Sequence, residues 1–167
     1  MGKNLNTSPN HYIEPKNCFT GNLTHPDLTV GIVCAEFNQF ITKSLLMGAI
    51  DGLTNHNIPQ DNIYTYFVPG AFEIPVVVEN LLPKVDVVIA IACVIKGDTP
   101  HFDYVCQGIT TGITQAIAQH KKPCIYCVLT TNTVDQAQQR ALPNSTTNKG
   151  YEAALAAIQT SSIIKKL

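Results

Sequence analysis

The feature that most constrains the fold is residues 86–95, DVVIAIACVI, where a single aspartate is followed only by apolar residues. Residues 28–35 (LTVGIVCA) and 123–130 (PCIYCVLT) form similar runs of strand length. Runs that are apolar at nearly every position predict strands buried on both faces, rather than strands with one face in water. Such strands are typical of a parallel sheet with helices on both sides.

Helical patterns alternate with these runs. In residues 41–56 the apolar residues Ile41, Leu45, Ala49 and Leu53 recur every fourth position, which predicts a helix with one buried face. The expected order is strand 28–35, helix 41–56, strand 63–68, short helix 72–82, strand 86–95, helix 100–120, strand 123–130, and helices 134–141 and 151–164. The alternation predicts an α/β fold with a parallel four-stranded sheet flanked by helices on both faces.

Length and charge limit the organisation and the partners. The 167 residues predict one domain, residues 28–167, preceded by a polar N-terminal arm, residues 1–27. The formal net charge is −1 and no basic run exceeds Lys121-Lys122, so nucleic acid is not an expected partner. No segment reaches the roughly 20 apolar residues of a membrane span, and no signal peptide is visible, so we expect a cytoplasmic protein without a membrane partner.

Six cysteines raise the question of a metal or a disulfide. Cys34, Cys93, Cys124 and Cys127 lie in apolar, strand-like runs. The CIYC stretch (124–127) has the spacing of a redox motif, but residues three apart in a strand point to opposite faces. No Cys/His cluster has zinc spacing, so we expect buried, reduced thiols and no metal site.

Polar or glycine-rich stretches follow each predicted strand. They are EFN (36–38), VPGAFE (68–73), VIKGDTPH (94–101) and TTNT (130–133). Ligands of open α/β sheets bind at the carboxyl ends of the strands, so these stretches predict one site. In the third stretch Thr99 is a good N-cap and Pro100 suits the first helical position, which places His101 in the first turn of a helix. Free N–H groups there bind anions, and the positive end of the dipole favours a neutral imidazole.

Each candidate residue also has an ordinary structural explanation. Gly70 could be a turn glycine, Glu73 a helix-start carboxylate and Phe37 a core residue. Arg140, like Lys149, is most simply a solvated charge. His101 is the strongest candidate, because a neutral imidazole suits a general base, and Thr99 beside it suits phosphate binding.

Five stretches in this order resemble one family: EFNQFIT, VPGAFEIP, VIKGDTPHFDYV, VLTTNTVDQAQQRA and NKG. They are similar to 6,7-dimethyl-8-ribityllumazine synthases, and the resemblance covers roughly residues 28–164. It implies a flavodoxin-like three-layer sandwich and pentamers with active sites between subunits. It also implies the condensation of 5-amino-6-(D-ribitylamino)uracil with 3,4-dihydroxy-2-butanone 4-phosphate, without a metal or other cofactor.

The resemblance also implies roles for individual residues. Within one subunit these are Phe37 stacked on the pyrimidine; Ala71, Phe72 and Glu73, with Asn38, at the ribityl chain; backbone groups of Cys93, Val94 and Ile95 at the pyrimidine edge; Asp98 and Thr99 at the phosphate; and His101 carrying protons. From the neighbouring subunit, Tyr126 covers the ring, Arg140 grips the phosphate and Lys149 supports Arg140.

Four positions depart from the family pattern. Lys96 stands where arginine is usual, Asp98 where a small neutral residue is common, Tyr126 in place of phenylalanine and Gln139 in place of an acid. Two alternatives therefore stay open. One is an archaeal-type riboflavin synthase, which does not need the phosphate grip. The other is a non-catalytic flavin- or lumazine-binding, or structural, paralogue.

The link between the last two helices bears on assembly. Residues 140–150, RALPNSTTNKG, are one residue longer than in shell-forming relatives and contain Pro143, which cannot continue a helix. The helix should therefore stop near Ala141. We expect a pentamer or two stacked pentamers rather than a closed shell. We also expect residues 10–27 to add an edge strand to a neighbouring sheet.

Overall fold

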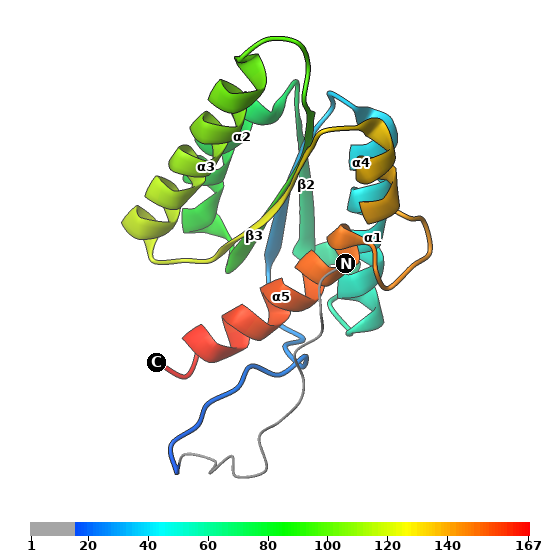
Figure 1. Cartoon of the computed structure of the whole chain (residues 1–167). Coiled ribbons are helices and arrows are strands. Elements are labelled where there is room, and N and C mark those ends of the chain that lie inside the picture. Colours follow the sequence, from blue (N-terminus) through cyan, green and yellow to red (C-terminus); the bar gives the residue numbers. More distant parts are fainter. Residues whose placement is uncertain (1–15) are drawn as a thin grey trace.

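The computed structural model describes residues 16–167 and contains a single parallel sheet (Figure 1). Its strands are β1 (Val30–Ala35), β2 (Ile63–Val68), β3 (Val87–Ile95) and β4 (Cys124–Thr131), in the order β2-β1-β3-β4. The register aligns the two central strands closely, with Val30 of β1 beside Val87 of β3. The chain leaves β1 towards one edge and β3 towards the other, so their carboxyl ends form the switch point where ligands bind in such sheets.

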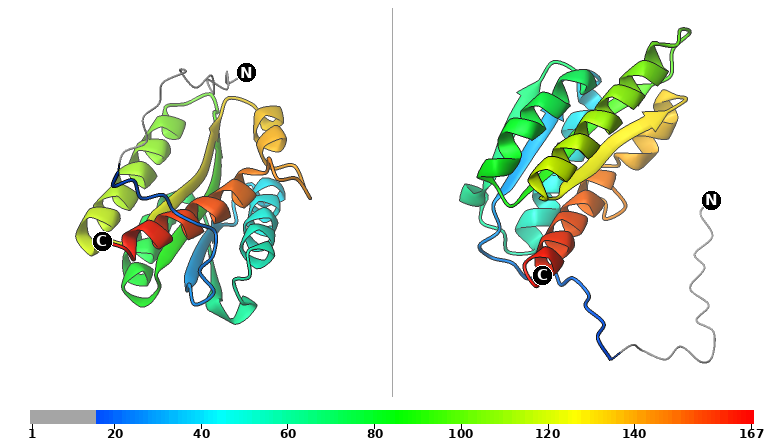
Figure 2. Two further views of the ribbon diagram at one scale, coloured as in Figure 1. Left: turned by 90° about the horizontal axis from the view of Figure 1, so that it is seen from below. Right: turned by 90° about the vertical axis from the view of Figure 1, so that its left-hand side faces the viewer.

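Helices cover both faces of the sheet, as the sequence predicts (Figures 1 and 2). They are α1 (Gln39–Asn55), α2 (Ile74–Leu81), α3 (His101–His120), α4 (Val134–Arg140) and α5 (Lys149–Ile164). One core cluster joins α1, α4 and α5 to the sheet, and the second joins α2 and α3 to the opposite face. This three-layer α/β arrangement confirms the predicted fold class.

The expected burial on both faces is confirmed for β1 but is wrong for β4, where Tyr126 and Thr130 are exposed, and the shorter strand β2 is more exposed still. Every residue of β1 is buried. In contrast, Tyr64, Tyr66 and Phe67 of β2 are exposed. The reason is the strand order: β2 is an edge strand, so one side of it has no neighbouring strand among the described residues. Local composition does not reveal which strand lies at an edge.

Helices α1 and α5 pack closely because small residues meet at their crossing. A Cβ at Gly52 would lie 2.7 Å from the Cβ of Ala154, and a Cβ at Gly150 would overlap the carbonyl oxygen of Leu45. The glycine of the NKG stretch is therefore required by close helix packing. Helix α5 begins at Lys149, two residues before the expected start, and α1 begins two residues early at Gln39.

The described part of the predicted arm lies against α5. The Asn22 N–H donates to Ser162 Oγ at 2.9 Å, and Lys166 Nζ donates to the Thr20 carbonyl at 3.3 Å. Residues 1–15 lie outside the described residues, so the division at residue 27 and the expected edge strand stay predictions. No helix within residues 16–167 is long and apolar enough to cross a membrane.

Candidate functional site

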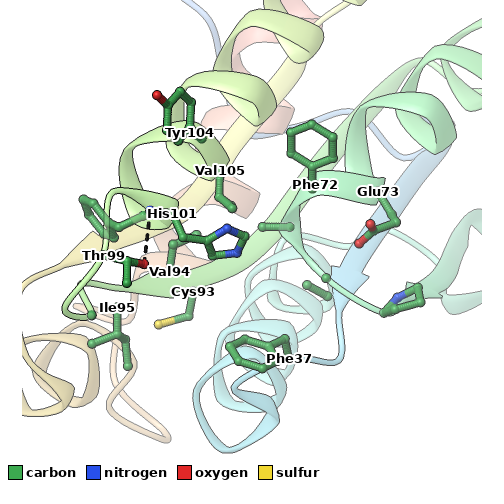
Figure 3. A pocket seen from close by; sticks show the side chains of 16 residues that line it. Phe37, Phe72, Glu73, Cys93, Val94, Ile95, Thr99, His101, Tyr104 and Val105 are labelled. Atoms are coloured by element: carbon green, nitrogen blue, oxygen red, sulfur yellow. Dashed lines mark hydrogen bonds between the residues drawn. The ribbon is translucent and has the colours of Figure 1, made fainter.

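A cavity of 780 Å³ opens at the carboxyl ends of β1, β2 and β3, beside the start of α3. We call it the large hollow. Nine of the predicted site residues line it: Phe37, Ala71, Phe72, Glu73, Cys93, Val94, Ile95, Thr99 and His101. Figure 3 shows the His101 ring directed into the space between Phe37 and Phe72. The stretches that follow β1, β2 and β3 therefore converge on one site, as the sequence predicts. The expectation is wrong for the fourth stretch, residues 130–133: Thr130 and Thr131 line a separate hollow, because β4 lies at the edge of the sheet beyond β3.

The turn after β1 is held by backbone bonds on one side and by a side chain on the other. The N–H groups of Glu36 and Phe37 donate to the carbonyls of Val68 and Pro69, at 2.8 and 3.0 Å. Asn38 Nδ2 donates to the Cys93 carbonyl at 2.9 Å. Asn38 itself is left-handed, with φ 57°, a conformation that asparagine tolerates better than most residues. Asn38 does not line the large hollow, because its amide connects this turn to the end of β3.

The turn after β2 carries the outer wall of the hollow. Ala71, Phe72 and Glu73 form a short 3-10 turn ahead of α2. The ring of Phe72 lies across Gly108 of α3, where a Cβ would overlap the ring edge. Phe72 is 61% exposed, so this ring is a surface wall rather than a core contact.

The turn after β3 brings His101 to the first turn of α3, as predicted, with a shift of one residue at the cap. Pro100 occupies the N-cap position, and its carbonyl accepts the N–H of Tyr104 at 3.3 Å. Thr99 Oγ1 accepts the N–H of His101 at 3.4 Å (Figure 3). The prediction that Thr99 is the N-cap is therefore wrong by one residue, and the Thr99 hydroxyl instead accepts a hydrogen bond within the turn. Asp98 is exposed and does not line the hollow.

Among the further residues that line the large hollow, three from the first turns of α3 were missed by sequence reasoning: Phe102, Tyr104 and Val105. Tyr104 follows His101 by three positions, so the two share a helix face. That spacing identifies residues that share a face with His101, but the sequence does not show how much of this face lines the hollow.

The remaining three predicted residues lie in a second hollow of 430 Å³ on the outer side of β4, between α4 and α5. We call it the edge hollow. It is lined by Tyr126, Arg140 and Lys149 among others, and it shares no lining residue with the large hollow. Arg140 is the only arginine in the sequence.

The two cations of the edge hollow have different partners. Arg140 Nη1 donates to the Gln136 carbonyl one turn earlier in α4, at 2.8 Å. The Lys149 ammonium pairs with the Glu152 carboxylate. Both remain at the surface, where an anion can reach them. Arg140 and Lys149 therefore line the same hollow, each held by its own helix, and the support of Arg140 by Lys149 stays a prediction.

Tyr126 is fixed to α3 by its hydroxyl. Thr110 Oγ1 donates its single proton to the Cys106 carbonyl at 2.7 Å, so in the 2.9 Å contact with Tyr126 the phenol must be the donor. Burial raises the pKa of Tyr126, which keeps the phenol protonated and able to donate. The ring is 41% exposed and stands at the mouth of the edge hollow.

Each hollow also contains a buried thiol. Burial raises the pKa of Cys93, in the large hollow, to about 11 and that of Cys127, in the edge hollow, to about 12. Thiols with such values stay protonated near neutral pH and are poor nucleophiles. The four strand cysteines are free and buried, and Cys124 and Cys127 belong to opposite core clusters, as predicted.

The two hollows have complementary chemistry. The large hollow is mainly apolar, with one imidazole and one carboxylate, and suits a flat heterocycle with a polar chain. The edge hollow offers an arginine and a lysine, which suit a phosphate. Residues 16–167 contain no cluster of three or more His, Cys, Asp or Glu side chains that could hold a metal ion.

Comparison with known protein families matches residues 27–165 to the model of 6,7-dimethyl-8-ribityllumazine synthase. The match covers most of the chain, including both hollows, and agrees with the four-stranded parallel sheet. It supports a role in riboflavin biosynthesis. The chain belongs to the 6,7-dimethyl-8-ribityllumazine synthase family.

Proposed function

We propose that the protein condenses 5-amino-6-(D-ribitylamino)uracil with 3,4-dihydroxy-2-butanone 4-phosphate to give 6,7-dimethyl-8-ribityllumazine. The observation that carries the proposal is the convergence of Phe37, Glu73 and His101 on one 780 Å³ cavity from three separate loops. A stacking ring, an acceptor for hydroxyl groups and a proton carrier are what this pair of substrates requires.

In the large hollow the pyrimidine stacks on Phe37, and backbone groups of β3 from Cys93 to Ile95 bind its edge. The ribityl hydroxyls lie along the turn after β2, where the carboxylate of Glu73 accepts hydrogen bonds. Phe72, resting on Gly108, closes the outer side. Asn38 keeps the first and third of these segments together through its 2.9 Å bond to the Cys93 carbonyl.

His101 moves the protons. The 5-amino group attacks the ketone, and water leaves as the C=N bond forms. Loss of phosphate then breaks a C–O bond and requires removal of a proton from the carbon chain. The enol left by this elimination tautomerises to a ketone. Finally, the ribityl-bearing nitrogen attacks this new carbonyl, and a second water leaves as the ring closes. The imidazole of His101, which lines the hollow, accepts and returns these protons.

The phosphate lies between two subunits in this proposal. Thr99 and the free N–H groups at the start of α3 bind it from one side. Arg140 of a neighbouring chain, with Lys149 nearby, binds it from the other, and that neighbour's Tyr126 covers the ring. The support is that the two hollows share no residue, so neither alone offers both a ring site and a pair of cations.

The assembly we propose is a homopentamer or two stacked pentamers. Helix α4 ends at Arg140 and Ala141 caps it, as the position of Pro143 predicts. The exposed edge of β2 is available for the arm of a neighbour. Light scattering tests the assembly: a mass of about five or ten times one chain fits, and hollow particles in negative stain contradict it.

Turnover with purified protein tests the reaction. We expect the absorbance of the lumazine product to appear together with free phosphate when both substrates are present. Formation of riboflavin from two lumazines would instead identify the riboflavin synthase alternative. Binding of lumazine without any turnover would identify the non-catalytic alternative.

A further inference from the structure

We propose that Asn148, assisted by Ser44, is a positioning residue that sets the separation of Arg140 and Lys149 in the edge hollow. The identity of the substrate in this inference rests on the proposed function, whereas the geometry does not. Asn148 directly precedes Lys149, and its side chain is 1% exposed. A fully buried amide must have its donors and acceptor satisfied, so its partners are informative.

The amide joins three segments of the chain. Asn148 Nδ2 donates to the carbonyls of Leu142, at 3.0 Å, and of Ser44 in α1, at 3.1 Å. Its Oδ1 accepts the N–H of Gly150 at 2.8 Å. Reversing the amide would place its oxygen against two carbonyls and its NH₂ against a donor, so only one orientation is possible.

Helix α1 is shaped to receive this side chain. A Cβ at Gly48 would lie 2.5 Å from Asn148 Oδ1, so glycine leaves the space that the amide occupies. Ser44, one turn earlier, donates its hydroxyl to the Ala141 carbonyl at 2.6 Å. Two consecutive carbonyls at the end of α4, of Ala141 and Leu142, are therefore held by side chains of α1 and of the start of α5.

The consequence concerns the two cations. Arg140 directly precedes the held carbonyls and Lys149 directly follows the buried amide, and both line the edge hollow. The chain between these anchors, residues 143–147, is exposed apart from half-buried Ser145. The anchors, rather than the length of this loop, thus determine where the two charges stand. A residue can be added to the loop without moving them.

The test compares changes to the anchors with a change to the loop. Asn148→Asp keeps the shape but loses both donors, and Ser44→Ala removes the hydroxyl at a helix position where alanine is well tolerated. We expect the KM for the phosphate-bearing ketone to rise about 5- to 50-fold in Asn148→Asp and about 2- to 5-fold in Ser44→Ala. The KM for the ribitylaminouracil should stay within about twofold. If Asn148→Asp does not fold, Ser44→Ala carries the test.

Two controls lie in the loop itself. Asn144→Asp changes an exposed asparagine to the same acid, and one glycine inserted between Pro143 and Asn144 lengthens the loop. Both should leave each KM unchanged. The proposal would be overturned if the inserted glycine raised the KM for the ketone as much as the anchor variants do. It would also be overturned if Ser44→Ala left this KM unchanged.

A second readout does not need turnover. Inorganic phosphate should raise the melting temperature of the assembled protein, and this shift should shrink in Ser44→Ala and Asn148→Asp but not in Asn144→Asp. If the wild type binds phosphate in this way but does not turn over, the proposed function fails while the positioning role stands. If phosphate stabilises the anchor variants fully, the positioning role fails whatever the reaction.

Discussion

The large hollow and the edge hollow differ in how their walls are held. In the large hollow, backbone N–H groups of Glu36 and Phe37 bond to the neighbouring strand end, so this wall continues the sheet, and Asn38 adds one side-chain anchor at the Cys93 carbonyl. In the edge hollow, side chains do this work: Thr110 holds Tyr126, while Ser44 and Asn148 hold the end of α4. Side-chain anchors depend on single residues, so the edge hollow should be much more sensitive to point substitutions away from the substrate.

The hollows also differ in what they can bind alone. The large hollow is mainly apolar, and it contains the only predicted proton carrier. The edge hollow has about half its volume, 430 against 780 Å³, and contributes charge. This contrast predicts that substitution of the proton carrier in the first should change turnover, and substitution of the cations in the second should change the affinity for the anionic substrate.

The largest effect should come from His101→Ala in the large hollow. Turnover should fall about 10- to 1000-fold, because a positioned general acid–base contributes about this much. It should not vanish, because holding two reactants together is itself a large part of catalysis. His120→Gln, at the far end of the same helix, is the matched control and should leave turnover unchanged. Wild-type rates for His101→Ala across about pH 6–8 would remove His101 as the proton carrier.

Arg140→Ala should act on binding rather than on chemistry. Loss of a charge-assisted contact costs on the order of 1.5–3 kcal/mol, so the KM for the phosphate-bearing ketone should rise about 10- to 150-fold. Arg140→Lys should recover only part of this, because lysine keeps the charge but loses the planar fork. Lys84→Ala removes an exposed cation far from both hollows and controls for net charge. An equal rise in KM for both substrates would contradict the assignment of Arg140 to the phosphate.

Mixing these two variants tests whether the hollows belong to one site. If a large hollow works with the edge hollow of a neighbour, co-assembled His101→Ala and Arg140→Ala chains should regain activity. About a quarter of the interfaces in an equal mixture pair two intact hollows. The readout is the rate after unfolding and refolding the chains together, compared with separately refolded chains that are then combined. If a verified mixed oligomer recovers no activity, the large hollow of one chain and the edge hollow of its neighbour do not act as one site.

The sequence predicts the large hollow better than the edge hollow, and the reason is physical. In parallel sheets the carboxyl ends of the strands meet at one edge, so the stretches that carry Phe37, Glu73 and His101 can be assigned to one site without coordinates. The anchors of the edge hollow depend on distant partners instead. The bond from Asn148 to the Ser44 carbonyl spans 104 positions, and no local pattern distinguishes it from an ordinary helix cap.

The same limit explains the two errors of detail in the fold. Periodicity places β2 at the right residues but not at the edge of the sheet, because strand order follows from the whole topology. It places a helix after Pro100 but does not say which side faces the hollow, so Tyr104 was missed. Properties of single elements were predictable, whereas properties of their contacts were not.

The smallest effect, and the sharpest comparison, concerns the bond between Tyr126 and Thr110. Tyr126→Phe and Thr110→Val both remove the neutral hydrogen bond between the phenol and Thr110, worth about 0.5–1.5 kcal/mol, so the KM for the ribitylaminouracil should rise about 2- to 10-fold. Thr110→Val also removes the hydrogen bond to the Cys106 carbonyl within α3. The two changes should not add, because both remove the same contact, and the double variant should resemble either single one. Thr114→Val is the control: Thr114 Oγ1 donates to the Thr110 carbonyl at 2.8 Å, the same helical bond without a tyrosine. If the rises in KM were additive, or if Thr114→Val raised the KM equally, Thr110 would support the helix rather than the ring. A non-additive pair with a silent control would show that this chain uses the phenol hydroxyl to hold its ring in place.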